Sequence, residues 1–271
     1  MKLLNVSIVT YHTDLDELSA CLESLRSECV NEIFIIDNAQ EERIREFCAG
    51  RQGVTYIPND NTGYGSAHNI ALRRSVADRV DFHLVLNSDV YFEPAILSKA
   101  VEYLHVTPSC GMLHPLIYGC DGNRQFTARM LPTPADLILR RFLPAGWFAA
   151  SRRRYLLKDL PVDEPVDVPY IQGSFMLIRT AALADVGLFD ERFFMYPEDI
   201  DLSRRIHASS RVVLHPGLKV THAHRASSYH NWRMLRVHIT NMIKYFNKWG
   251  WIFDRERTAV NATLRRKLKK K

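Results

Sequence analysis

Short apolar runs and longer amphipathic segments alternate through the first 107 residues of the chain. The apolar runs have the length of buried strands, and the amphipathic segments have the apolar spacing of helices. This alternation predicts an α/β fold built on a mostly parallel sheet with helices on both faces. The predicted strands are residues 3–9, 32–36, 54–57 and 82–86, and the predicted helices lie near residues 14–28, 40–50, 65–78 and 94–104.

Each of these predicted strands ends in polar side chains. The carboxyl ends of parallel strands meet along one edge of a sheet, where ligands bind. Asp and Asn also favour turns, so one such end alone has an ordinary structural explanation. Four together favour a binding cleft, and they are Thr10-Tyr11, Asp37-Asn38, Asn59-Asp60-Asn61 and Asn87-Ser88-Asp89.

The regular alternation stops after Pro108, and six prolines interrupt residues 130–169. The same stretch carries arginines at positions 140, 141, 152, 153 and 154. This composition predicts a long excursion over the surface rather than a core element, either a functional loop or a mobile insertion.

A last amphipathic helix is predicted from Trp232 to Trp249. Such a helix more often packs on its own domain, but Trp-Gly-Trp at 249–251 and the basic end are typical of a membrane interface. The apolar stripe of this helix consists of Leu235, Ile239, Met242, Phe246 and Trp249.

The positive charge of the chain is concentrated at its C-terminal end. Residues 225–271 hold 13 Lys and Arg against 2 Asp and Glu, a balance of +11 in a chain of net charge +6, which leaves −5 for residues 1–224. This distribution argues against a nucleic-acid-binding core and favours a tail that meets an anionic partner such as a membrane surface. We therefore predict one domain over residues 1–225, with halves 1–107 and 108–225, and a C-terminal amphipathic, basic extension over residues 226–271.

The five cysteines form no Cys-x-x-Cys pair, so the sequence predicts neither a disulfide framework nor a zinc knuckle. No signal peptide and no run of about 18 apolar residues is evident. We expect a cytoplasmic protein that is peripheral, at most, on the inner face of the cell membrane.

Three carboxylates are crowded behind Pro197, at Glu198, Asp199 and Asp201. Proline suits the first turn of a helix, and the partial positive charge of a helix N-terminus keeps nearby carboxylates ionised. Capping of a surface helix would explain an isolated pair. An ionised carboxylate can also accept a proton, so Glu198 and Asp199 are candidate catalytic residues.

Asp89 follows a buried strand and can offer a hard oxygen ligand to a divalent metal that holds a diphosphate. One Asp is not a metal site. His222, at the end of a later β-like run, is a candidate second ligand, although a lone histidine is more often simply hydrogen-bonded.

Gly63 and Gly65 precede a predicted helix, where free backbone N–H groups could face a phosphate or a sugar. Their spacing is not that of a dinucleotide-binding or Walker loop.

Six blocks, in order, resemble the signatures of family 2 glycosyltransferases, and most closely the bacterial rhamnosyltransferase-like branch. The resemblance covers about residues 3–225, and it is specific for the family but much less so for the sugar. The blocks are Val6–Tyr11, Ile35–Asn38, Asn61–Asn69, Leu86–Asp89, Gly173–Arg179 and Phe189–Leu202.

This resemblance implies a GT-A fold, a Rossmann-like sheet that binds a nucleotide-diphospho-sugar. It further implies inverting transfer of a sugar, with rhamnose favoured, to a glycan or polyprenyl-linked glycan in bacterial cell-surface polysaccharide synthesis. Asp199 would be the base, and Asp89 would bind Mg²⁺ or Mn²⁺. The chain has Asn87 where the family's Asp-x-Asp pattern begins with Asp, which leaves one charge fewer for the metal.

Donor contacts are implied for residues at the strand ends and helix starts. Asp37 is expected to recognise a pyrimidine, so the donor would be of the dTDP or UDP type. Arg152, Arg153 and Arg154 are expected near an acceptor pyrophosphate. The complete set of donor-binding residues is Thr10, Tyr11, Asp37, Asn61, Gly63, Gly65, Asn69, Asn87 and Gly173.

Two other functions share these features. A metal-dependent sugar nucleotidyltransferase would use the same cleft, but it usually needs a glycine-rich, basic loop after the first strand, which Val9–Asp14 lacks. A non-catalytic sugar-binding protein on the same fold would not need Asp37, Asp89 and Asp199 together.

Overall fold

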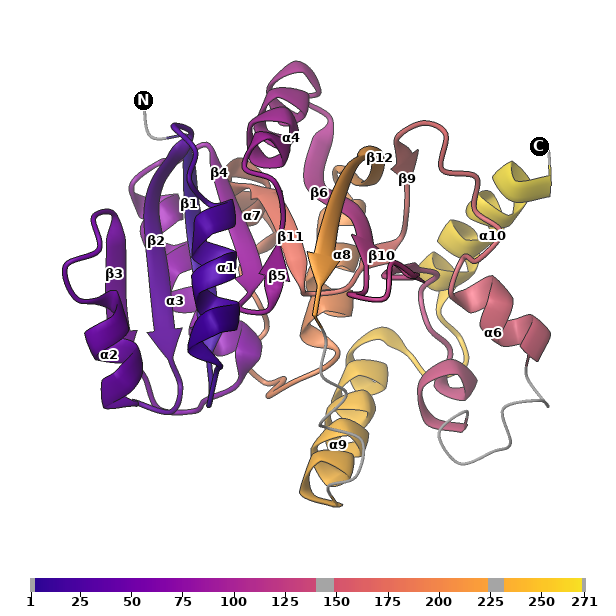
Figure 1. The fold of residues 1–271 in the computed structure, drawn as a ribbon. Helices are drawn as coiled ribbons and strands as arrows, with labels where there is room; N and C mark the ends of the chain where they lie inside the picture. The colour runs from indigo at the N-terminus through magenta and orange to yellow at the C-terminus, as the bar shows by residue number, and fades with distance from the viewer. Residues whose placement is uncertain (1–2, 140–148, 224–231, 270–271) are drawn as a thin grey trace.

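In the computed structural model, residues 3–139, 149–223 and 232–269 are described, and ten strands of this part form one sheet with helices on both faces (Figure 1). The strand order is β3-β2-β1-β4-β11-β6-β12-β5, and β7 and β9 pair with β6 and β12. The predicted α/β class with a mostly parallel sheet is confirmed.

The first half of the sheet follows the sequence pattern closely. Its strands are β1 (Leu4–Thr10), β2 (Val30–Asp37), β3 (Val54–Pro58) and β4 (Phe82–Asn87), which pair in parallel. Its helices are α1 (Leu15–Ser24), α2 (Glu42–Cys48), α3 (Tyr64–Ala77) and α4 (Ala95–Val106). All eight predicted elements are confirmed, and their ends differ by a few residues from the prediction. At α1 a cap sets the start, because the Asp14 side chain accepts hydrogen bonds from Asp16 N and Glu17 N.

The second half continues the same sheet. Strand β11 (Phe175–Arg179) runs antiparallel between β4 and β6 (Cys110–Tyr118), and β12 (Arg211–His222) pairs in parallel with β6. Helices α7 (Thr180–Val186) and α8 (Glu198–His207) lie between β11 and β12 in the chain. The short strands are β5 (Val90–Tyr91), β7 (Arg124–Gln125), β8 (Ala128–Arg129), β9 (Val166–Asp167) and β10 (Tyr170–Ile171).

The prediction that residues 130–169 only cross the surface is wrong in part. Leu131, Tyr155, Leu160 and Val168 are buried in an apolar cluster with residues of α8 and β12. The six prolines interrupt helical and strand periodicity, so the pattern did not reveal these core positions. The stretch includes a π-helical turn at Ala135–Leu139 and helix α6 (Ala149–Tyr155), and Arg140 and Arg141 lie outside the described residues.

Alternate residues of β11 face opposite sides of the sheet and so join two apolar clusters. Phe175 and Leu177 pack with residues of α1 and α4, whereas Met176 and Ile178 pack with residues of α7 and α8. The antiparallel strand is therefore buried on both faces, and the two halves share one core.

The predicted C-terminal helix is confirmed as α9 (Trp232–Trp249), and a further helix, α10 (Arg255–Lys269), follows it. Met242 and Phe246 of the predicted stripe are buried. The Asn261 side chain exchanges two hydrogen bonds with the Leu131 backbone, at 3.0 and 2.9 Å. The C-terminal helices are thus fastened to the domain, while its predicted boundary near residue 225 stays a prediction.

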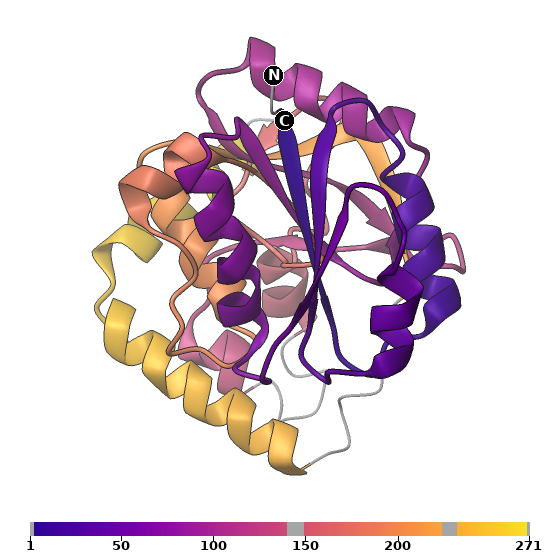
Figure 2. The same ribbon diagram turned by 90° about the vertical axis from the view of Figure 1, so that its left-hand side faces the viewer.

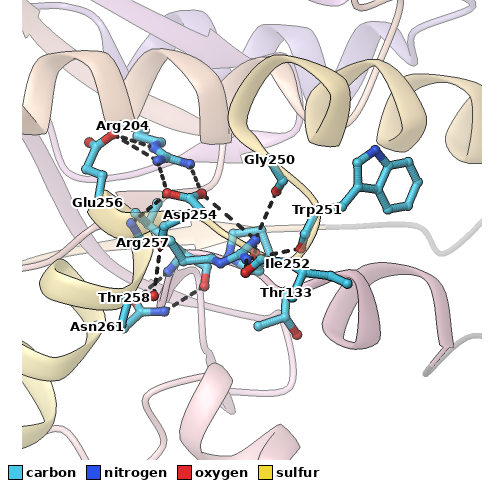
Figure 3. Close-up of polar contacts among 12 residues, drawn as sticks. Thr133, Arg204, Gly250, Trp251, Ile252, Asp254, Glu256, Arg257, Thr258 and Asn261 are labelled. Carbon is cyan, nitrogen blue, oxygen red and sulfur yellow. Dashed lines mark hydrogen bonds and ion pairs between the residues drawn. The ribbon is translucent and has the colours of Figure 1, made fainter.

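A buried ion pair joins α8 to the start of α10 (Figure 3). Arg204 is 2% exposed and donates to both Asp254 carboxylate oxygens at 2.7 Å, and it also donates to Glu256. A two-pronged charged pair with no solvent access is costly to break, because the remaining partner is left charged and buried.

Arg204→Met should lower the free energy of unfolding by about 3–5 kcal/mol, because it strands the Asp254 carboxylate. The matched control is Arg153→Met, which removes an exposed pair with Asp159 and should cost at most about 1 kcal/mol. Urea denaturation measures both values. Equal losses in the two variants would contradict the structural role of the buried pair.

Candidate active site

The polar strand ends predicted to form one edge do lie side by side. The registers of β1 with β2 and with β4 pair Thr10 with Asp37 and Val9 with Asn87. Beyond β3, Asn59 N donates to Asp37 O, and the Asn38 side chain bonds those of Asn59 and Asn61. This edge of the sheet is the candidate active site.

Asp37 is fully buried beneath the edge. One carboxylate oxygen accepts from Thr10 Oγ1 and Ala39 N, and the other accepts from Glu41 N and Tyr56 Oη. Each carboxylate oxygen has two lone pairs, so these four donors occupy the whole group. In this arrangement Asp37 shapes the loop after β2, and direct contact with a base would require one donor to leave.

Two other predicted donor-binding residues are accessible. Tyr11 is 55% exposed, with its ring 4.4 Å from that of His12, and Asn61 is also exposed. A flat, exposed aromatic ring next to polar strand ends can stack on a planar base.

Gly63, Gly65 and Asn69 instead hold the loop before α8. A Cβ on Gly63, whose φ is +112°, would collide with the Phe194 carbonyl, and a Cβ on Gly65 would lie 2.9 Å from Phe189 Cβ. The buried Asn69 side chain bonds the backbone N–H and carbonyl of Phe189 and also the Glu191 carboxylate. These three residues contact the chain itself, which gives the two glycines a structural explanation, and donor binding at their backbone N–H groups stays a prediction.

A chain of hydrogen bonds links the candidate base to the end of β4. Gly173 N donates to Asp199 Oδ2 at 3.1 Å. The Tyr64 hydroxyl lies 2.8 Å from Gly173 O and 2.9 Å from Asn87 Oδ1, so its one proton is shared between two acceptors. A Cβ on Gly173 would lie 3.3 Å from the Tyr64 ring and 3.7 Å from Asp199 Cβ, so this close approach suits glycine.

Glu198 and Asp199 occupy the first turn of α8, as predicted. Burial raises the pKa of Asp199 to about 7, although hydrogen bonds from Ile200 N and Gly173 N favour its ionised form. Burial and the Asp199 charge raise the pKa of Glu198 well above its usual range, and its Oε2 has no hydrogen-bond partner among the described residues. The pair thus combines Glu198, whose ionised form is disfavoured, with an Asp199 that can take up a proton near neutral pH.

The sequence pattern missed Arg129. It lies on β8 opposite Tyr170 of β10, and its positive charge favours the ionised form of Asp199. The two-residue strand belongs to no periodic segment and no motif, so nothing in the sequence singled it out. Tyr64 lies in the sequence block Asn61–Asn69, but only the structure shows that it bridges Asn87 and Gly173.

Asp89 and His222 meet through the pairing of β5 with β12. The His222 Nε2 lies 3.2 Å from Asp89 Oδ1, and its Nδ1 lies 3.2 Å from Gln125 Oε1. Within the part of the chain that the structure describes, no group of three or more His, Cys, Asp and Glu is gathered for a metal. A carboxylate and an imidazole fit a divalent ion that takes its remaining ligands from a diphosphate and water.

Arg152, Arg153 and Arg154 are exposed on α6, and Arg153 is paired with Asp159.

Among the helices of the described residues, none is both long and apolar enough to cross a bilayer.

The family model that matches the chain is "Glycosyl transferase family 2", over residues 6–187. The chain is 31% identical to the N-acetylglucosaminyl-diphospho-decaprenol L-rhamnosyltransferase of Mycobacterium tuberculosis over 242 residues, which cover 83% of this chain and 77% of that protein. It is 26% identical to the rhamnosyltransferase WbbL of Escherichia coli (strain K12), covering 88% and 90% of the two chains.

Solved structures share the fold at low sequence identity. A structure of GalNAc-T7 with UDP, GalNAc and Mn²⁺ superposes with a TM-score of 0.68 at 18% identity, over 94% of this chain and 49% of that one. The mannosyltransferase PcManGT from Pyrobaculum calidifontis, in complex with GDP-Man and Mn²⁺, has a TM-score of 0.55 at 16% identity, over 89% and 64%.

The raised pKa of Asp199 predicts a pH-dependent stability. The contribution is fully present below the unfolded pKa of about 4 and is lost as pH rises through about 7, because the folded state then has to bury the charge. Asp199→Asn should therefore flatten the fall in melting temperature between these values, and the exposed Asp163→Asn should not. Parallel profiles for wild type and Asp199→Asn would show that Asp199 titrates near its ordinary pKa.

Proposed function

Because the chain belongs to glycosyl transferase family 2, we propose that it is an inverting, metal-dependent rhamnosyltransferase. It takes the sugar from a dTDP or UDP donor and passes it to a lipid-linked glycan. The observation that carries this proposal is the Asp199 carboxylate, held by Gly173 N at the start of α8 with a pKa of about 7.

A carboxylate with this pKa suits the proton transfer of an inverting reaction. The acceptor hydroxyl oxygen bonds to the anomeric carbon as Asp199 takes its proton, and the bond between that carbon and the diphosphate oxygen breaks. A base is most effective when its pKa lies near the working pH, because it is then both ionised and basic enough. Burial and the Asp199 charge raise the pKa of Glu198, which disfavours a second negative charge that would compete for the proton.

The donor would lie along the carboxyl ends of β1, β2 and β4. Tyr11 offers an exposed ring for the base and Asn61 an exposed amide, while the Thr10–Asp37 pair supports them from beneath. Asn87 and Gly173 would line the sugar side through their shared contact with Tyr64. The relatives named as rhamnosyltransferases favour rhamnose as the sugar.

Asp89 and His222 would hold Mg²⁺ or Mn²⁺. Gln125 would fix the orientation of the imidazole ring through its hydrogen bond with His222 Nδ1. When bound, such an ion neutralises charge on the departing diphosphate. Two structures with the same fold were determined with Mn²⁺ and a nucleotide or nucleotide-sugar.

The acceptor is proposed to be a polyprenyl-linked glycan, met at the cytoplasmic face of the membrane. The name of the mycobacterial relative specifies an N-acetylglucosaminyl-diphospho-decaprenol acceptor. Arg152 and Arg154, exposed on α6, could pair with an acceptor pyrophosphate, whereas Arg153 would first have to leave Asp159.

The two other functions considered are less well supported. A nucleotidyltransferase does not need a base poised at the start of α8, and a non-catalytic sugar-binding protein gains nothing from a buried Glu198 next to an Asp199 of raised pKa. Release of a nucleoside diphosphate from a nucleotide-sugar, measured with acceptor and metal present, separates a transferase from both.

Asp199→Asn should lower kcat by about 10²–10⁴-fold, because the amide cannot accept the proton. Binding of the nucleoside diphosphate, measured by calorimetry, should change little. In the wild type kcat should fall as pH drops below about 7, since Asp199 is then protonated. The exposed Asp163→Asn is the control, and near-normal turnover by Asp199→Asn would remove it from the role of base.

Asp89→Asn should abolish the part of UDP or dTDP binding that depends on Mn²⁺, because the amide carries no charge for the ion. The exposed Asp121→Asn should retain it, and a chelator should reduce wild-type binding to the level of the Asp89 variant. His222→Gln should weaken the metal-dependent part less. Binding that ignores both chelator and Asp89→Asn would contradict a metal site here.

A further inference from the structure

A row of exposed apolar side chains follows α9 and the loop after it. Trp232 is 84% exposed, Ile252 78% and Phe253 94%, and Ile243 and Trp251 are also exposed. We refer to these five residues as the outer apolar surface.

This surface is not the stripe that the sequence pattern picked out. Met242 and Phe246 of the stripe are buried, and Trp249 donates its indole N–H to the buried Asp201 at 2.8 Å. The stripe is used for packing on the domain. The outer apolar surface is a second apolar set, left over after that packing is complete.

The loop that carries Ile252 and Phe253 is held from inside (Figure 3). The Arg257 guanidinium donates to the carbonyls of Gly250, Trp251 and Ile252. Because its backbone is anchored toward the domain, the loop keeps its large side chains outward. Such an arrangement lowers the entropy lost when the loop binds a partner.

The charges carried by α9 have one sign. Residues 225–253 contain no Asp or Glu, and Arg236 and Lys244 are exposed on α9. Just beyond, Arg255 is exposed, whereas Asp254 and Glu256 are both paired with Arg204. Exposed Trp and aliphatic residues next to cations, without acids, are typical of a segment that lies in the interface of an anionic bilayer. A protein partner of mixed charge would not require this one-sided composition.

We propose that the outer apolar surface seats the protein on an anionic lipid bilayer, with Ile252 and Phe253 inserted among the lipids. In Figures 1 and 2, α9 lies on the outside of the molecule, near the end of the sheet where β1 and β2 finish, whereas α10 leads away to the other side. The contact is therefore made by α9 and its loop rather than by the basic residues of α10. Its purpose rests on the proposed function, since a lipid-linked acceptor is met at a bilayer, but binding needs no substrate.

The test is sedimentation of the full-length protein with vesicles of phosphatidylglycerol and phosphatidylcholine, against vesicles of phosphatidylcholine alone. The wild type should bind the anionic vesicles and retain part of this binding at high salt, because apolar insertion is not screened. The Ile252→Ser/Phe253→Ser double variant should bind about tenfold more weakly. Since both side chains are exposed, its melting temperature should match that of the wild type.

The charge control is Arg266→Gln/Lys267→Gln on α10, which should bind nearly as the wild type does. The reverse ranking of the two double variants, or a wild type that ignores anionic vesicles, would overturn the proposal. Light scattering of the free protein tests whether a second copy of the chain covers the outer apolar surface instead. A dimer that dissociates in the loop variant, while vesicle binding stays unchanged, would also overturn the proposal.

Transfer to a water-soluble acceptor separates this proposal from the proposed function. The loop variant should retain wild-type transfer in solution while losing vesicle binding. Vesicle binding without any transfer activity would contradict only the proposed function.

Discussion

Two carboxyl groups in the first turn of α8, the buried Glu198 and the partly buried Asp199, impose the constraint on which the rest of the structure depends. Burial makes the ionised form of Asp199 costly and raises its pKa to about 7, and burial together with the Asp199 charge raises the pKa of Glu198 well above its usual range. The partial positive charge of the helix start and the N–H groups of Gly173 and Ile200 recover part of that cost. Both contributions act only if α8 stays in position against β10 and the loop at Gly173.

Helix α8 is held in that position from its opposite side. The buried Asp201, two residues after Asp199, accepts from Arg205 Nε and Trp249 Nε1 and is paired with Lys248. One turn further on, Arg204 is bound to Asp254 and Glu256. The C-terminal segment therefore serves two surfaces at once, because the inner sides of α9 and α10 fix the helix that carries the candidate base while the outer side of α9 and its loop remains apolar and cationic.

The sequence was most informative where neighbouring residues determine the structure. The periodicity of apolar residues predicted the elements of the first half and placed the polar strand ends along one edge, and the helix start at Glu198 was found from its own carboxylates and the preceding proline. The pattern failed where partners are distant in the chain. Asn69 reads as a ligand residue, yet it binds Phe189, 120 positions away, and Arg129 acts on Asp199 without belonging to any motif. Burial of residues around Pro132 likewise depends on contacts with α10.

The contact between Arg204 and Asp254 spans 50 positions, and that between Leu131 and Asn261 spans 130. During synthesis the strands of the first half can pair early, but these contacts cannot form until residues 254–261 have left the ribosome. The candidate base is thus fixed in place only after that segment has been made. A nascent chain therefore has the candidate donor-binding edge of the sheet before it has α8 held in position beside that edge.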